Sequence, residues 1–200
     1  MQNTEHGRPR IGKKGIRALG IAESFHKKLG SRAVLAAVAM RSDLVVDGMA
    51  LGTCTVGGMD ATDSIITLWK AMGRDDIQLV MLNGCVISWF NVIDLTRLHQ
   101  ELKRPIICLT YEESAGIENY FRRYFPEDWE ERLRIHLRNG ERCSITLKTG
   151  FDVFIRSLGI DADYSKKVLD KFTLHGKYPE PIRLAKMAAH SVLEMLSLGA

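Results

Sequence analysis

The sequence lacks a long hydrophobic run. No window holds about 18 consecutive apolar residues, which a membrane-spanning helix needs. The first residues, Met-Gln-Asn-Thr-Glu-His-Gly-Arg-Pro-Arg, have no apolar core and do not resemble a secretory signal. These absences predict a soluble, cytoplasmic protein with no membrane partner.

Several catalytic motifs are also missing. The 4 cysteines form no C-x-x-C pair, and no H-x-x-x-H or H-E-x-x-H occurs, which excludes the common zinc and dithiol redox sites. The sequence has no G-x-x-x-x-G-K-[ST] and no G-x-S-x-G, which excludes a P-loop and a nucleophile elbow. Three cysteines lie in apolar runs, and we expect them to be reduced and buried: Cys54, Cys108 and Cys143.

The composition is that of an ordinary globular domain. The chain has 200 residues, 46% hydrophobic and 26% charged, and a chain of this length buries a core without disulfides or a structural metal. The net charge of +4 is mild, but basic residues crowd the start: Arg8, Arg10, Lys13, Lys14 and Arg17. We interpret residues 1–15 as a basic arm, which either lies on phosphates or is a solvated terminus. Residues 16–200 are expected to form a single domain.

Short apolar runs predict five strands, over residues 16–21, 33–40, 44–56, 77–82 and 105–109. Short polar links join the first three runs, so an antiparallel meander is expected. Helical segments precede the last two runs, and strands reached through such crossovers lie parallel. Two further runs, residues 143–147 and 153–155, suit a hairpin across Thr149-Gly150.

Helices are expected between and after these strands. Asp60 suits the N-cap of a helix that ends at Gly73, residues 90–102 read as a second helix, and residues 114–125 as another. The order of elements is that of a ribonuclease H-like α/β fold, with a mixed five-stranded sheet flanked by helices. In that fold the first and fourth strands are parallel neighbours whose carboxyl ends form the active edge. The positions to inspect are therefore residues 20–23 and 82–84.

Five stretches in this order resemble the archaeal endonuclease dU family, relatives of endonuclease V: Leu19-Gly-Ile21, Gly57-Gly-Met-Asp-Ala-Thr62, Val80-Met-Leu-Asn-Gly84, Phe90-Asn-Val-Ile-Asp94 and Pro179-Glu-Pro-Ile-Arg183. Each stretch is weak alone, but the ordered set is fairly specific and covers most of residues 16–195. The resemblance implies a ribonuclease H-like fold and metal-dependent cleavage of DNA that carries deoxyuridine. It implies Mg²⁺ or Mn²⁺ as cofactor and nucleic acid, DNA more than RNA, as partner.

The sequence departs from the family pattern where the chemistry is expected. The pattern ends its first strand with Gly-Ile-Asp-Asp and its fourth with Leu-Asp-Gly, whereas this chain has Ala22-Glu23 and Asn83. Near the last helix the pattern has Ala-His, whereas this chain has Ala185-Lys186. Glu23 and Asn83 are the metal ligands that remain, so we expect Mg²⁺ to bind weakly, because about two formal negative charges are lost.

Other residues have both a catalytic and a structural interpretation. Asp60 can reach the active edge beside Glu23 and Asn83, or only cap its helix. Arg183 can hold the scissile phosphate or pair with an acid. Trp89 and Phe90 can wedge or stack a flipped base, or pack in the core. Lys186 can line a phosphate path or be solvated.

Two functions follow from these interpretations. The first is a Mg²⁺-dependent endonuclease for deoxyuridine-containing or damaged DNA, with Glu23, Asp60 and Asn83 in a reduced metal site and Arg183 assisting. The second is a degenerate relative that binds nucleic acid or a protein partner without cutting. The oligomeric state is left open by the sequence.

Overall fold

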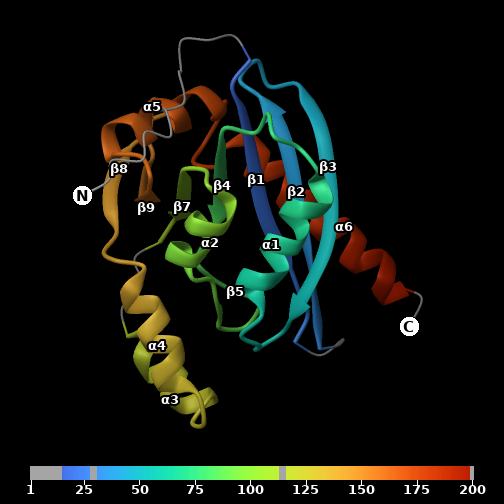
Figure 1. Ribbon diagram of the computed structural model, residues 1–200, viewed down its shortest axis with the longest axis vertical. Helices are drawn as coiled ribbons and strands as arrows, with labels where there is room; N and C mark the ends of the chain where they lie inside the picture. The colour runs from blue at the N-terminus through green and yellow to red at the C-terminus, as the bar shows by residue number, and fades with distance from the viewer. Residues whose placement is uncertain (1–14, 28–30, 113–115, 199–200) are drawn as a thin grey trace.

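A mixed β-sheet forms the centre of the molecule (Figure 1). In this computed structural model, which describes residues 15–27, 31–112 and 116–198, the sheet has 7 strands in the order β3-β2-β1-β4-β7-β9-β8. The strands are β1 (Arg17–Ser24), β2 (Arg32–Arg41), β3 (Val46–Thr55), β4 (Leu79–Asn83), β7 (Ile106–Thr110), β8 (Cys143–Thr146) and β9 (Asp152–Leu158).

The predicted pairing of the first five strands is confirmed. β1, β2 and β3 pair antiparallel, while β1, β4 and β7 lie parallel. The almost wholly apolar β2 is buried from Ala33 to Met40, because β1 and β3 pair with its edges and helices cover both of its faces. The ribonuclease H-like α/β architecture is therefore present.

The predicted number of strands in the sheet, five, was too low. The hairpin of β8 and β9 joins the same sheet, with β9 antiparallel to β7. The addition covers the edge of β7, whose Ile106 and Ile107 are fully buried. Because β8 is the new edge strand, Cys143 on it is exposed, which corrects the expectation that it is buried; Cys54 and Cys108 are buried as predicted.

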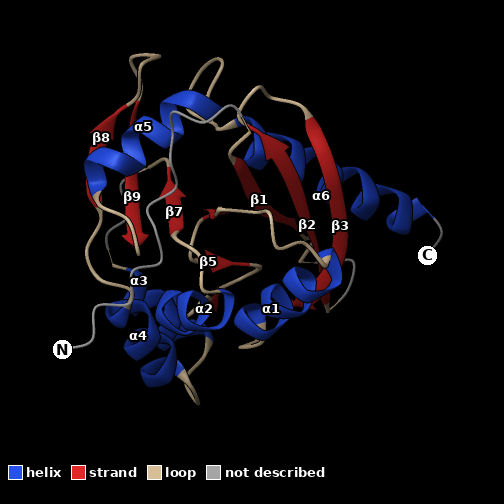
Figure 2. Cartoon of the chain, turned by 45° about the horizontal axis from the view of Figure 1, so that its top comes forward, coloured by secondary structure: helices blue, strands red, loops and turns tan. Residues whose placement is uncertain are grey.

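Helices cover both faces of the sheet (Figure 2). On one face, α1 (Ala61–Met72) and α2 (Leu95–Leu102) bury Ile65 and Leu98 against Ile21 and Leu82. On the other face, α5 (Ala162–Phe172) and α6 (Glu180–Leu198) pack against β1, β2 and β4 and the neighbouring strands. None of the helices formed by the described residues is long and apolar enough to cross a membrane.

The prediction of a helix over residues 90–102 was wrong in its first part. A small hairpin of β5 (Val86–Ile87) and β6 (Asn91–Val92) precedes α2, which begins only at Leu95. Ser88, Trp89 and Phe90 form the turn of that hairpin, and all three have positive φ angles (42°, 60° and 65°) that an α-helix does not allow.

The remaining helices, α3 (Ile117–Tyr124) and α4 (Trp129–Arg138), lie together at one end of the molecule (Figure 1). They pack on the small hairpin through Phe121, Ile135 and Val92. Most of the predicted basic arm lies outside the described residues, namely Arg8, Arg10, Lys13 and Lys14. Arg17, counted with them, instead belongs to β1 and pairs with Asp47 and Asp76.

Candidate functional site

The carboxyl ends of β1 and β4 meet at one edge of the sheet, as predicted. The last registered pair of these parallel strands is Ile21 with Leu82. Ala22 and Asn83 come one residue later, and Glu23 follows Ala22. Their side chains line a small pocket whose other walls are apolar. The backbone therefore brings the predicted positions together.

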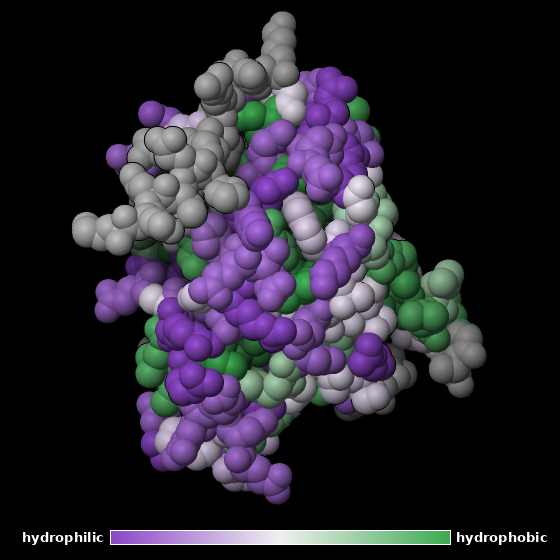
Figure 3. Space-filling view, in the orientation of Figure 1, coloured by the Kyte–Doolittle hydropathy of each residue, from purple (hydrophilic) through white to green (hydrophobic). Residues whose placement is uncertain are grey.

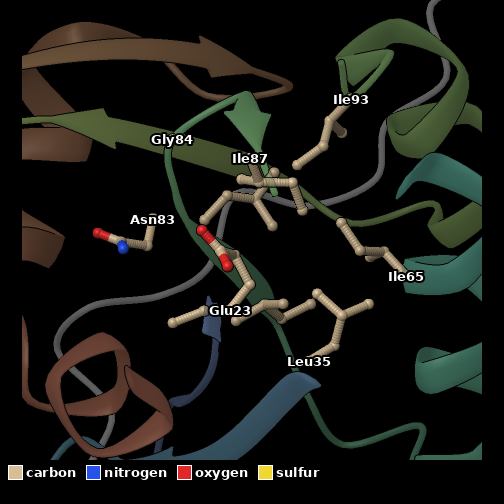
Figure 4. Close-up of a pocket in the computed structure, with 10 residues that line it drawn as sticks. Glu23, Leu35, Ile65, Asn83, Gly84, Ile87 and Ile93 are labelled. Carbon is tan, nitrogen blue, oxygen red and sulfur yellow. The ribbon is translucent and has the colours of Figure 1, made fainter. Parts of the chain in front are cut away.

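The side chains of Glu23 and Asn83 nevertheless lie on opposite faces of the sheet. Successive strand residues alternate between faces, so Glu23 shares the face of Ile21, towards α1, whereas Ala22 faces α6. Asn83 follows Leu82 and so shares the face of Ala22. Figure 4 shows the Asn83 amide pointing away from the Glu23 carboxylate. These two side chains do not converge on one point.

Among the residues that the structure describes, Glu23 is the one acidic side chain that lines this pocket. Burial raises the pKa of its carboxyl above the ordinary value, although the amide and hydroxyl of Ser88 and the charge of Lys186 act to lower it. Its Oε2 atom is buried and accepts no hydrogen bond from any residue that the structure describes. A buried carboxylate with a free oxygen costs stability, and such a cost is typical of a functional site.

The raised pKa of Glu23 predicts a pH-dependent stability. The native state binds the Glu23 proton more tightly than the unfolded chain, so stability is lost as the pH rises above the ordinary value of 4.5. Glu23→Gln keeps the shape without the charge. We expect it to stabilise the fold at pH 7, and the difference to vanish at a pH below the ordinary value. Urea unfolding at both pH values measures this.

Glu194→Gln is the matched control for that experiment. His26 holds the pKa of the exposed Glu194 carboxyl below its ordinary value. The charged form of Glu194 is therefore favoured in the native state, so that removing its charge should not stabilise the fold. Equal stability of the wild type and Glu23→Gln at both pH values would show that the buried charge carries no cost.

The side chains at this edge do not fit a resident magnesium ion. Mg²⁺ takes oxygen ligands in octahedral geometry. Glu23 offers one free oxygen, the Asn83 amide points elsewhere, and the walls around Glu23 are apolar: Ile21, Leu35, Ile65, Leu82, Ile87 and Ile93. Among the described residues, no group of three or more acidic, histidine or cysteine side chains is arranged to hold a metal ion.

The Asp60 carboxylate is hydrogen-bonded within the turn between β3 and α1. It accepts hydrogen bonds from the amide and hydroxyl of Thr55 and from the Asn91 amide. Burial acts to raise the pKa of Asp60, but these donors outweigh it and hold the pKa below its ordinary value. Asp60 is the N-cap residue of α1, as predicted, but its side chain makes no capping hydrogen bond. The Asn91 Oδ1 accepts from the Ala61 amide instead.

The two basic candidates lie on α6. Arg183 donates to the buried Glu180 carboxylate, with a Nε–Oε2 distance of 2.8 Å, so the structure favours the acid-paired interpretation for this residue. Lys186 acts on Glu23 electrostatically, and its Nζ lies 5.8 Å from the ring centroid of Tyr178. Of the two, only Lys186 is placed to influence the Glu23 carboxylate.

Trp89 and Phe90 lie directly after Ser88 in the strained hairpin turn. Neither is fully buried, and their ring centroids are 5.0 Å apart. Lys27 lies over the Trp89 ring at 3.0 Å from its centroid. The structure thus places an aromatic pair and a cation next to the Glu23 pocket.

Two residues that shape the surroundings of Glu23 and Trp89 had no signal in the sequence. Ser88 reaches the Glu23 carboxylate only because the turn bends back towards β1. Arg132 on α4 is 2% exposed and donates to the carbonyls of Gly57, Gly58 and Phe90. Arg132 therefore ties the hairpin turn to the loop before α1.

Comparisons with known proteins agree with this geometry. Residues 14–193 match the model of the family described as endonuclease dU. The UPF0215 protein of Pyrobaculum calidifontis is 37% identical over 180 residues, which cover 90% of this chain and 98% of that protein. The UPF0215 protein of Pyrococcus furiosus is 28% identical over 186 residues, covering 90% of this chain and 94% of that protein.

Solved structures show the same fold. A protein of unknown function from Archaeoglobus fulgidus superposes with a TM-score of 0.77 at 24% identity, covering 89% of this chain and 98% of its own. Endonuclease V of Ciona intestinalis, in complex with DNA containing an inosine, gives a TM-score of 0.60 at 14% identity, covering 92% of this chain and 87% of that protein.

Proposed function

Because this chain belongs to the endonuclease dU family, we propose that it binds DNA carrying deoxyuridine or another damaged base at the carboxyl ends of β1 and β4, without cutting it efficiently. The family and the endonuclease V-like fold support a nuclease-like function. The residues of this chain support binding of the DNA more than its cleavage.

One observation carries the proposal. Ala22 and Asn83 stand side by side on the α6 face, where the resemblance implies carboxylates, and neither carries a charge. The remaining acid, Glu23, lies on the opposite face in an apolar pocket. Phosphodiester cleavage of this class relies on metal ions held by carboxylates. Binding needs only cations and stacking groups, which Lys27, Lys186 and Trp89 supply.

A second candidate function is metal-dependent cleavage at Glu23, favoured by its buried, unpartnered Oε2. Because the side chains at this edge do not hold Mg²⁺ by themselves, the substrate phosphate would have to bring the further oxygen ligands, with Glu23 as the one protein carboxylate among the described pocket residues that could meet the ion.

An incision assay distinguishes the two candidates. It uses deoxyuridine-containing duplexes and single strands, with Mg²⁺ and Mn²⁺ tested separately. We expect the wild type to bind this DNA and leave it intact. Ala22→Asp with Asn83→Asp should gain cleavage and bind Mg²⁺ at least about tenfold more tightly, because both new carboxylates lie on the α6 face. Calorimetry measures the metal affinity.

The controls address folding and the second candidate. Ala22 packs against Ala185 and Ala189, so Asn83→Asp alone is tested beside the double variant, with thermal melting of each. Cleavage by the wild type that Glu23→Gln abolishes, with DNA binding retained, would contradict our proposal and establish the second candidate. If no variant binds deoxyuridine-containing DNA at low salt, both candidates fail.

A further inference from the structure

Aromatic side chains from two separate segments gather at the hairpin turn that contains Ser88. Trp89 and Phe90 come from the hairpin turn, and Tyr120 and Tyr124 come from α3. We call these four residues the aromatic platform. Nothing in the sequence pairs the tyrosines with the hairpin, because about 30 residues separate them and only the packing of α3 brings them together.

The rings of the aromatic platform are aligned. The Phe90 ring lies 5.8 Å from Tyr120 and 5.9 Å from Tyr124 between centroids, at interplanar angles of 19° and 20°. The two tyrosine rings are within 7° of parallel. Aligned planar faces suit flat ligands that stack, such as nucleobases.

The tyrosines are exposed although they have no role in the core. Tyr120 is 49% exposed and Tyr124 is 40% exposed, whereas Phe121 of the same helix is fully buried and anchors α3. The half-exposed tyrosine rings on this anchored helix therefore form a surface that a ligand can contact.

Cations accompany the rings. Lys27 lies over Trp89, and the Arg123 guanidinium lies 5.4 Å from the Tyr124 ring centroid. Figure 3 shows that the end of the molecule formed by α3 and α4 is covered mainly by hydrophilic residues. A surface of aromatic faces and positive charges is complementary to bases and phosphates. It differs from the core of a protein–protein interface, which is more apolar.

The hairpin turn holds the platform against the site. Ser88, Trp89 and Phe90 keep sparsely populated positive φ angles because Arg132 binds the Phe90 carbonyl and the Gly57 amide donates to the Ser88 carbonyl. Ser88 also contacts the Glu23 carboxylate. The turn that carries Trp89 and Phe90 is therefore linked to the pocket at the strand ends through Ser88.

We propose that the aromatic platform binds unpaired bases of single-stranded DNA, through stacking on Trp89, Phe90, Tyr120 and Tyr124 and phosphate contacts from Lys27 and Arg123. This rests on the proposed function and names the form of DNA that the site prefers. A duplex hides the faces of its bases, so only unpaired nucleotides can use these rings.

The test is the affinity for a labelled oligothymidylate of about 15 nucleotides and for a duplex of equal length, measured by fluorescence anisotropy at low salt. Tyr120→Leu with Tyr124→Leu keeps apolar area but removes the flat faces. We expect single-strand affinity to fall about tenfold for each ring that stacks a base, with duplex affinity unchanged. Quenching of tryptophan fluorescence by the oligonucleotide should weaken in Trp89→Phe.

Phe151→Leu is the matched control, since Phe151 is also 49% exposed but lies in the turn between β8 and β9. Its single-strand affinity should equal that of the wild type. If the double tyrosine variant binds the single strand as tightly as the wild type, or loses duplex binding equally, this inference is wrong while the proposed function stands. A wild type that binds no DNA refutes both.

Discussion

Replacing Gly20 by alanine is expected to lower the free energy of unfolding by about 3 kcal/mol, the upper part of the usual range for overpacking. Gly20 lies in the middle of β1, where the first turn of α6 crosses the sheet. A Cβ atom there would lie 2.2 Å from the carbonyl carbon of Pro181 and 2.5 Å from the amide nitrogen of Ile182. Both atoms belong to the backbone, so α6 itself must move away from β1.

Gly52→Ala is the control for this prediction. Gly52 lies in β3, and among the described residues its added Cβ would meet only the Leu68 side chain, at 3.4 Å from Cδ1 and 4.0 Å from Cβ, which are ordinary contacts. Alanine is favoured over glycine in a strand, so the control should be neutral or slightly stabilising. Urea unfolding of both variants measures the difference. Similar stability of the two variants would mean that α6 is not packed so tightly against β1.

Replacing Arg132 by methionine is expected to cost about 3 kcal/mol, because charge-assisted hydrogen bonds to buried carbonyls are lost. The guanidinium donates to Gly57 and Phe90 at 2.9 and 2.8 Å and pairs with Asp128 through two nitrogens. Methionine retains the bulk of the side chain but leaves the carbonyls without donors. A drop of roughly 6–12 °C in melting temperature is expected for a chain of this size.

The same substitution should also weaken single-strand binding. Arg132 fixes the Phe90 carbonyl in the strained turn, so its loss should let Trp89 and Phe90 leave the aromatic platform. Arg134→Met is the matched control on the same helix, since Arg134 is exposed and pairs only with Glu131 among the described residues. Exposed pairs contribute about 0–1 kcal/mol, so the control should melt near the wild type. An equal loss in both variants would contradict the anchoring role.

Much of the fold could be predicted because its signals are local. The apolar run of β2, Asp161 at the start of α5 and Pro179 before α6 each act within a few residues of their own position. The Asp161 carboxylate accepts a hydrogen bond from the Tyr164 amide, as the side chain of an N-cap does. The helical segment before β4 then predicted that β4 lies parallel to β1, since the right-handedness of such crossover connections leaves few possible strand arrangements.

The hairpin turn shows where such signals fail. Apolar and polar residues in 90–102 fit a helical period, but the chain folds residues 86–92 into a hairpin. Arg132 stabilises this hairpin from outside, and the Asn91 side chain of the hairpin donates to the Thr55 carbonyl. The partners of Arg132 lie as far as 75 positions away, and no local pattern encodes such a pairing. Asp60 likewise takes the N-cap position that the sequence predicts, but its carboxylate binds Thr55 and Asn91 and not the first amides of the helix.

The sequence alone determined the order of the elements, the strand ends at which a site belongs, and the absence of carboxylates at Ala22 and Asn83. Only the tertiary structure decided that Glu23 faces α1 while Asn83 faces α6, that Ser88 touches the Glu23 carboxylate, and that α3 brings its tyrosines to the hairpin. The periodicity of a strand or helix depends only on residues that are close in the sequence. The convergence of side chains from distant segments depends on how the packed elements close on one another.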